Sequence, residues 1–236
     1  MIIPSLPAQT SGRRRRRAKP DAPSNRPSEA RSRIMTAALR AFAERGFHGT
    51  SVPDIAAAAR VGVGSIYRHF ESKERLVNAV FRDAKARLRD SLLLDFDMSR
   101  PEGAIFADLW FRLVRFQRAE PFAFQFLEMQ DHVPYLDGES RALEASLLAP
   151  LLAAASRPSG PADDTPALVI AIVWGAFVGL TKAERLGYIS LDDAKLRRAG
   201  EICFASVAFA LALRSPDDAE AAILSPPKAK KSTRRQ

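Results

Sequence analysis

The side chains with the clearest binding chemistry lie in one short segment, between Val63 and Lys73. When this segment is drawn as a helix, Ile66 falls on one side, and Gly64 and Arg68 fall on the other. An outward arginine offers a planar pair of N–H donors that matches guanine O6 and N7. A glycine beside it lets the backbone come close to a partner. The residues predicted to meet base edges in a DNA groove are Val63, Gly64, Ser65 and Arg68.

Two helices are expected to precede this segment. Apolar residues recur at spacings of three and four before residue 43, which predicts a first helix with Ser28 as its N-cap and Gly46 just after its end. The hydroxyls of Thr50 and Ser51 can cap a second helix. Asp54 lies three residues after Ser51 and completes a capping box.

The segment itself is predicted to be a third, short helix from Ser65 to Phe70, followed by a long helix that Ser72 caps. The two glycines of Arg60–Gly64 indicate a tight turn before it. Two short helices joined by such a turn form a helix-turn-helix, whose second helix enters the DNA major groove. Many helical bundles contain a similar pair, so the geometry alone leaves a purely structural role open.

The residue types in this region favour a DNA-binding helix pair over a purely structural one. This region carries Phe42-Ala43-Glu44-Arg45-Gly46-Phe47, Thr50-Ser51-Val52-Pro53-Asp54-Ile55-Ala56 and Val61-Gly62-Val63-Gly64-Ser65-Ile66-Tyr67-Arg68-His69-Phe70. With them, the stretch from Arg33 to Leu76 resembles the DNA-binding domain of the TetR family of bacterial transcription factors. One departure is Arg60, where the family usually has glycine. A positive φ there would store roughly 1 kcal/mol of strain in an arginine, unless Gly62 absorbs the bend.

The resemblance also implies contacts to DNA phosphates. They are assigned to Tyr67, His69 and Lys73, and to the hydroxyls of Thr50 and Ser51 at a helix N-terminus, where free N–H groups favour anions. Two of these residues have an alternative role. Tyr67 could be a half-buried packing residue, and His69 could lie at the edge of the core.

The basic charge is concentrated near the ends of the chain. The net charge is +9, and residues 1–33 alone carry nine Lys or Arg against two acids, whereas residues 34–214 balance 22 against 22. This distribution favours a polyanion partner, although basic tails can also serve solubility alone. The predicted disordered arm, residues 1–28, contains the run Arg13–Arg17 and is expected to contact DNA.

Composition excludes several classes of protein. Hydrophobic residues make up 47% of the 236 residues, which is ordinary for a soluble protein. A single cysteine and three scattered histidines argue against a disulfide framework and a metal cluster, so no cofactor or metal is expected. The longest apolar stretch, about 14 residues from Ala167 to Leu180, is shorter than the ~20 of a membrane span. We expect a cytoplasmic protein with no membrane partner.

The rest of the chain is predicted to be helical, near 101–119, 121–130, 139–156, 164–187 and 191–214. With the four earlier helices this makes nine, the TetR-family number, and the fold class is all-α. Nine of the 19 aromatic residues fall between Phe96 and Tyr135. The resemblance implies a cavity here for a small hydrophobic or aromatic ligand, although a plain hydrophobic core would look similar. Its candidate residues are Phe106, Trp110, Phe126, Met129, His132, Tyr135 and Trp174.

The last two helices are predicted to form a homodimer interface. Gly175 and Gly179 are four residues apart, which lets another helix approach closely, and the following helix has an apolar face. By resemblance, two such helices from each subunit make a four-helix interface. The candidate residues are Gly175, Gly179, Phe204, Val207 and Leu211.

Together these features predict a helix-turn-helix domain at 29–75, a ligand-binding and dimerisation domain at 76–214, and a basic tail at 215–236. The predicted function is a homodimeric repressor that a ligand releases from a palindromic operator on double-stranded DNA. An activator of the same fold and a non-specific nucleic-acid-binding protein are the alternatives. An enzyme is disfavoured because the sequence has no nucleophile elbow, zinc-protease motif or phosphate-binding loop.

Overall fold

The computed structural model describes residues 26–129, 131–155 and 165–212, and within these ranges it contains helices and no strand. This confirms the all-α fold class. Residues 1–25 of the predicted basic arm and the whole predicted tail, residues 215–236, lie outside the described residues. The elements are α1 (Arg26–Arg45), α2 (Val52–Ala59), α3 (Val63–Phe70), α4 (Lys73–Leu93), α5 (Glu102–Ala119), α6 (Pro121–Met129), the 3-10 helix η1 (Val133–Tyr135), α7 (Gly138–Ala155), α8 (Thr165–Arg185) and α9 (Asp193–Ala212).

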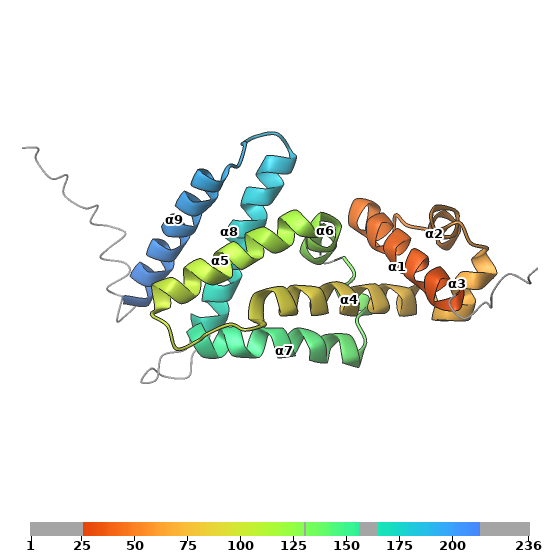
Figure 1. The fold of residues 1–236 in the computed structure, drawn as a ribbon, viewed down its shortest axis with the longest axis horizontal. Coiled ribbons are helices and arrows are strands. Elements are labelled where there is room, and N and C mark those ends of the chain that lie inside the picture. Colours follow the sequence, from red (N-terminus) through yellow and green to blue (C-terminus); the bar gives the residue numbers. More distant parts are fainter. Residues whose placement is uncertain (1–25, 130, 156–164, 213–236) are drawn as a thin grey trace, which may run out of the picture.

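The helices form an elongated molecule with two ends (Figure 1). Helices α1, α2 and α3 gather at one end, and α8 and α9 lie at the other. Helix α4 extends from the first end along the middle of the molecule, where it packs against α5, α6 and α7. A change in the position of α4 would therefore be felt at both ends.

The helix-turn-helix forms for the local reasons that the sequence suggests. The Ser51 Oγ accepts a hydrogen bond from the Asp54 N–H at 3.2 Å, and the Ser72 Oγ accepts one from the Arg75 N–H at 3.2 Å. Gly46 has a φ of +70° directly after α1, which fits its predicted place at the end of that helix. Both caps and the terminating glycine are thus confirmed.

Two predicted boundaries in this domain are wrong. Helix α1 begins at Arg26, so Ser28 lies inside the helix and is not its N-cap. Helix α3 begins at Val63, two residues earlier than predicted, with Gly62 as its N-cap. A glycine can occupy the first turn of a helix, so Gly64 does not have to belong to the turn before α3. Because the prediction assigns both glycines to the turn, it places the start of the helix two residues too late.

Arg60 takes the left-handed conformation that its position between α2 and α3 requires, with a φ of 54° and a ψ of 48°. Its N–H donates to the Ala57 carbonyl at 3.1 Å, and the Val61 N–H donates to the Ala56 carbonyl at 3.0 Å. These two bonds close α2 in a Schellman-type turn. Gly62 has a φ of −75°, so it does not absorb the bend and the strain is at Arg60.

The helix-turn-helix is fixed to the rest of the chain through the end of α1. The Asp131 carboxylate accepts a hydrogen bond from the Phe47 N–H at 2.6 Å, and the Gln125 side chain donates to the Ala43 carbonyl at 2.8 Å. The Tyr135 ring stacks on the Phe47 ring with 4.0 Å between centroids. Polar and aromatic contacts therefore join the two parts, and one buried core runs through both.

A buried asparagine connects α4 to the start of α7. The Asn78 amide donates to the carbonyls of Glu74 and Tyr135, at 2.8 and 2.7 Å, and its Oδ1 accepts from the Asp137 N–H and the Ser140 hydroxyl, both at 2.8 Å. Partial burial would raise the pKa of Asp137, but hydrogen bonds from Ser140 and Arg82 outweigh it and lower that pKa to about 2. The carboxylate therefore stays ionised and holds Arg82.

Candidate nucleic-acid interface

Helix α3 packs against α1, α2 and α4 with one face and leaves the other open. Ile66 and Phe70 are buried on the inner face, as the helical projection predicts. Gly64 and Arg68 are exposed, and Tyr67 is 48% exposed. Ser65 lies beside Arg68, with 3.4 Å between its Oγ and a guanidinium nitrogen. The structure thus brings a serine and an arginine together on α3, and an exposed tyrosine lies on the same helix.

Gly64 is not needed by the fold itself. A Cβ atom built at this position meets nothing within 4 Å, and the residue has helical backbone angles. A side chain would fit here in the isolated molecule. The absence of one is useful only to a partner that approaches the helix closely.

Ser51 and Thr50, both predicted to contact phosphate, differ sharply. Ser51 is exposed at the N-terminus of α2, where it can reach a phosphate while it caps the helix. Thr50 is only 2% exposed, and its hydroxyl lies 3.0 Å from the Ala41 carbonyl and 2.8 Å from the Gly46 carbonyl. The predicted contact at Thr50 does not fit this geometry, because the hydroxyl is used to hold the end of α1.

Lys73 and His69 are less exposed than a phosphate contact would suggest. The Lys73 ammonium lies 4.1 Å from the centroid of the Phe47 ring, and partial burial lowers the pKa of this lysine. His69 is half-buried beside Phe70, which is near the alternative that places it at the edge of the core. His69 lies near the end of α3 and Lys73 at the start of α4.

Arg60 is a cationic residue of this surface that the sequence marks only as a source of strain. It is exposed in the turn directly before α3. A positive charge kept at a strained position is the sequence signal that could have marked it as a phosphate contact. We add it to the candidate interface, which comprises Ser51, Arg60, Val63, Gly64, Ser65, Tyr67, Arg68, His69 and Lys73.

Comparison with protein families agrees with this geometry. Residues 34–80 match the model described as bacterial regulatory proteins of the tetR family, and residues 81–209 match the tetracyclin repressor-like C-terminal domain. The chain belongs to the TetR family. The TetR family is one of DNA-binding regulators rather than enzymes.

The curated relatives that match this TetR-family chain do so over a short stretch. The repressor KstR2 of Mycolicibacterium smegmatis is 45% identical over 64 residues, which is 27% of this chain and 31% of that protein. The regulator UidR of Escherichia coli is 38% identical over 66 residues, 26% of this chain and 34% of that protein. The chain thus matches about a third of the length of these relatives.

Solved structures support the fold over a larger part of the chain. A TetR-family regulator from Marinobacter aquaeolei, 24% identical, has a TM-score of 0.63 and covers 77% of this chain and 96% of its own. A TetR-like regulator from a Rhodococcus species, 20% identical, has a TM-score of 0.61 and covers 81% and 99%. At these identities the likeness shows the fold alone.

The predicted ligand residues of this TetR-family chain fall into three separate groups. Phe106 and Trp110 lie between α5 and α9, where the Trp110 indole N–H donates to the Leu196 carbonyl at 2.9 Å. Met129 and Tyr135 lie beside the helix-turn-helix domain. The remaining three are within the core, where Phe126 stacks on His132 and Trp174 contacts Phe124.

His132 is the most unusual of these residues. It is 1% exposed, stacks on Phe126 at 4.4 Å between centroids, and its Nδ1 has no hydrogen-bond partner among the described residues. Its pKa is lowered to about 4, mainly by burial and also by the positive charge of Lys85, while the charges of Asp131 and Glu144 act in the opposite direction. The imidazole is therefore neutral at physiological pH.

The predicted interface residues also separate. Gly175 and Gly179 are exposed on α8 with open space beside them. Phe204 and Val207 instead face inward, and Phe204 packs against Phe106 of the same chain at 5.2 Å between ring centroids. The side chain of Leu211 lies outside the described part.

Two further properties bear on function. Among the described residues, no group of three or more His, Cys, Asp or Glu could hold a metal ion. In the same part of the chain, α8 is long and apolar enough to cross a membrane by length and composition alone, and only 11% of its apolar stretch is buried. Such a helix is weak evidence for a membrane, but its exposed face needs an explanation.

Proposed function

We propose that this TetR-family protein is a homodimeric repressor in the cytoplasm that binds a palindromic operator and leaves it when a small apolar ligand binds. The observation that carries the proposal is the row of Gly64, Ser65 and Arg68 on α3, in which Gly64 and Arg68 are exposed and Ser65 is half-buried. The N-terminal part of a recognition helix meets base edges, and an arginine fork there prefers guanine. The exposed Ser51 and Arg60 flank this row and would hold the DNA backbone.

The exposed face of α8 supports the dimer. Leu168 and Ile172 are 60% and 55% exposed, and Gly175 and Gly179 continue the same stripe at helical spacing. Ile202 on α9 adds another exposed apolar side chain. A soluble monomer rarely leaves such a stripe uncovered, and a second copy would cover it. A two-fold dimer would then present two copies of α3 to two half-sites.

Helix α4 is the element through which a ligand would act. Its first turn contacts the helix-turn-helix, where Lys73 lies over Phe47, and its last turns pack among the helices of the C-terminal part. A ligand that prefers one arrangement of those helices would shift α4 and change the spacing of the two recognition helices.

The test is selection of bound DNA from a random pool by the full chain. The proposal predicts an inverted repeat whose half-sites are centred about one or more helical turns apart. An Ile172→Glu variant is expected to be monomeric and to lose the preference for two half-sites, whereas Arg141→Glu, at an exposed position on α7, serves as the control. Coating of DNA without a shared sequence would contradict specific binding, and selection of a single asymmetric site would contradict the dimer.

A further inference from the structure

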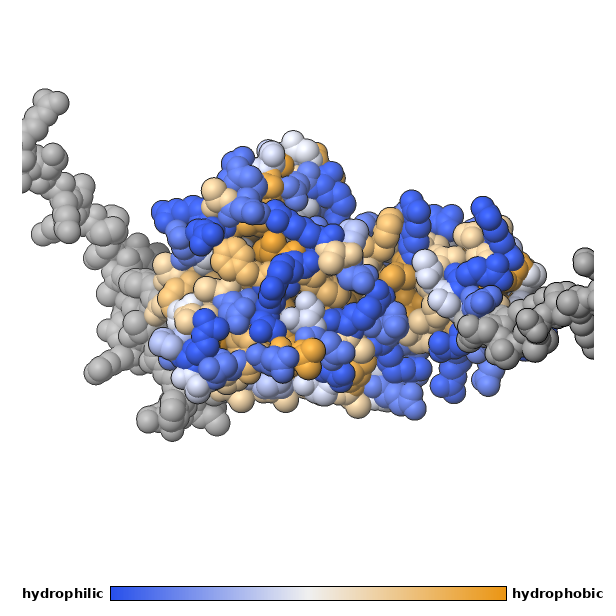
Figure 2. Space-filling model, viewed as in Figure 1, coloured by the Kyte–Doolittle hydropathy of each residue, from blue (hydrophilic) through white to orange (hydrophobic). Residues whose placement is uncertain are grey.

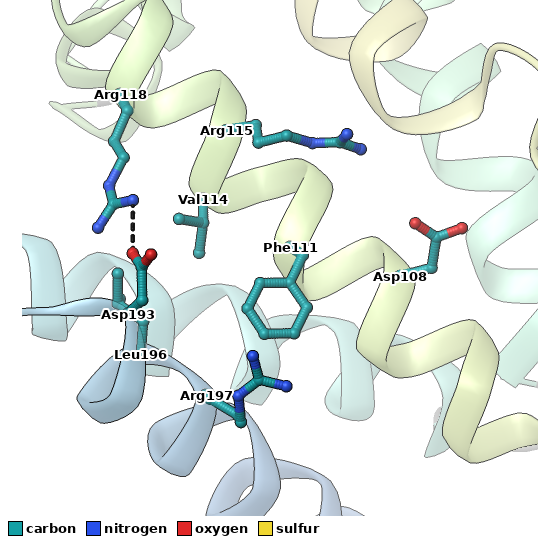
Figure 3. A pocket seen from close by; sticks show the side chains of 8 residues that line it. All are labelled: Asp108, Phe111, Val114, Arg115, Arg118, Asp193, Leu196 and Arg197. Carbon is teal, nitrogen blue, oxygen red and sulfur yellow. Dashed lines mark hydrogen bonds and ion pairs between the residues drawn. The ribbon is translucent and has the colours of Figure 1, made fainter.

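The surface between α5 and α9 is hollowed into an open cleft of about 390 Å³ (Figure 3). This volume is within the range of small-molecule sites, about 300–1,000 Å³. The cleft is separate from the DNA-binding surface, since its lining residues belong to α5 and α9, whereas α2 and α3 lie at the other end of the molecule (Figure 1). It includes none of the residues that the sequence predicts to bind the ligand.

The floor of the cleft is apolar. Val114 and the half-buried Phe111 point from α5 toward α9, and Leu196 of α9 lies opposite them (Figure 3). Figure 2 shows apolar side chains at this place between α5 and α9, with hydrophilic side chains around them. The apolar part of a small ligand would be removed from water here.

At the rim of the cleft, the negative charges are all in ion pairs, whereas some of the positive charges are not. Arg118 is paired with Asp193 at 2.8 Å, so these two charges compensate each other. Asp108 is paired with two arginines that do not line the cleft, Arg100 at 3.1 Å and Arg112 at 3.2 Å.

The other two arginines of the rim are Arg115 and Arg197. Among the described residues, neither guanidinium group has a carboxylate within ion-pair distance. The Arg197 guanidinium lies over the Phe111 ring, 5.4 Å from its centroid, and this contact holds it at the edge of the apolar floor. A planar guanidinium binds a carboxylate with two parallel hydrogen bonds. The charges that remain therefore suit a ligand with one anionic group next to an apolar body.

We propose that this cleft binds an amphipathic carboxylate, with the anionic group at Arg197 and the alkyl or aryl body on the apolar floor, since Arg115 points away from α9 (Figure 3). The proposal rests on the proposed function only for its effect on DNA. It makes the effector an anion, whereas the aromatic residues of the sequence suggest an uncharged ligand.

Asp108 connects the cleft to α4. Its carboxylate accepts a hydrogen bond from Arg112, and Arg112 donates to the Leu94 carbonyl at 2.8 Å, at the end of α4. A bound carboxylate brings a second negative charge into the cleft that Asp108 lines, which changes the balance of charges that holds Arg112 on the end of α4. The helix that carries the DNA-binding domain is thus linked to the cleft through two side chains.

Calorimetric titration of the full chain with octanoate tests the site, and octan-1-ol, which has the same chain without the charge, is the matched probe. We expect octanoate to bind at least tenfold more tightly than octan-1-ol, and the variant Arg197→Gln to lose at least tenfold in octanoate affinity. Arg198→Gln is the control, since Arg198 is the exposed neighbour of Arg197 on α9 and is paired with Glu201. It should stay within twofold of the parent.

Three results would overturn the site: no saturable octanoate binding below about 10 mM, equal affinity for the alcohol, or an equal loss in Arg198→Gln. A second titration measures the affinity for the selected DNA with and without octanoate. We expect octanoate to lower it in the parent and to have no effect in Asp108→Asn. If octanoate binds but the DNA affinity of the parent is unchanged, the link through Asp108 is wrong, while DNA binding itself still stands.

Discussion

The two ends of this TetR-family protein hold their candidate binding residues in different ways. At the DNA-binding end, the outward residues follow one another within a single helix, and their arrangement depends on contacts a few residues apart, such as the bond from Arg68 to Ser65. At the regulatory end, contacts join residues far apart, such as Trp110 and Leu196. Recognition of DNA is thus built on local geometry, whereas recognition of a ligand depends on how whole helices pack.

The largest expected effect is a loss of stability at low pH, and it is expected at His132, in the regulatory half. Its imidazole is buried and neutral, and its pKa is lowered to about 4 from 6.5. Between these two pKa values, His132 is therefore protonated in the unfolded chain and neutral in the folded chain. Stability is fully present above pH 6.5 and is lost as the pH falls toward 4, by roughly 3 kcal/mol for this group.

Denaturant unfolding of the parent and of His132→Leu between pH 7 and pH 4 measures this loss. The variant is expected to lack most of the decline in free energy of unfolding. The same change at the exposed His48 is the control and should keep the decline. Equal pH profiles for the parent and His132→Leu would show that this histidine is not the buried neutral group described here.

The next effect separates two adjacent residues at the DNA-binding end. Thr50→Val removes the buried hydroxyl that donates to the carbonyls of Ala41 and Gly46 and is expected to cost about 2 kcal/mol of stability, with little change in the DNA affinity of the folded protein. Ser51→Ala removes an N-cap, costs about 1 kcal/mol, and should also weaken DNA binding. Thermal unfolding and DNA titration of both variants give the answer. Weaker DNA binding in Thr50→Val than in Ser51→Ala would reverse the assignment.

The sequence predicts the helix-turn-helix well because its signals are local. The caps at Ser51 and Ser72 and the glycine after α1 each act within a few residues, and the projection that places Ile66 inward needs only the helical period. The motif does not reveal that Thr50, the residue before the cap, is buried by its contacts with α1.

The regulatory half is predicted less completely for the same reason. The helices themselves follow from composition and proline positions, and their approximate ranges agree with the structure. Which faces meet cannot be deduced from one helix at a time. Phe204 illustrates this, since the sequence assigns it to contacts with a partner subunit but it packs on Phe106 of its own chain. The cleft between α5 and α9 depends on residues at least 75 positions apart, such as Arg118 and Asp193, and leaves no signal in the sequence.

A smaller effect concerns the basic arm. Because α1 begins at Arg26, the deletion that keeps this helix intact removes residues 1–25, which include Arg13–Arg17 and Lys19. We expect roughly tenfold weaker binding at low salt and a flatter dependence on salt, by about 0.9 in slope for each phosphate that the arm neutralises in the parent. Sequence preference should stay the same. An unaltered slope in DNA titrations at several salt concentrations would remove the arm from the interface.

The smallest effect is expected at Arg60. Glycine has no Cβ to clash in the left-handed conformation, so Arg60→Gly should raise the free energy of unfolding by up to about 1 kcal/mol. Arg60→Ala keeps the strain and serves as the control. Both variants remove the charge and should weaken DNA binding by the same factor. Lower stability in Arg60→Gly than in Arg60→Ala would contradict the assigned strain.

The central claim is that the exposed face of α3 reads base edges, and the double variant Ser65→Ala/Arg68→Ala tests it most directly. The measurement is the ratio of affinities for the selected DNA and for a scrambled sequence of equal length. Our account predicts that this ratio falls roughly thirtyfold, which corresponds to about 2 kcal/mol, while affinity for the scrambled DNA changes little. Arg141→Ala, at an exposed position on α7, should leave the ratio unchanged. A double variant that discriminates between the two sequences as well as the parent does would contradict the account.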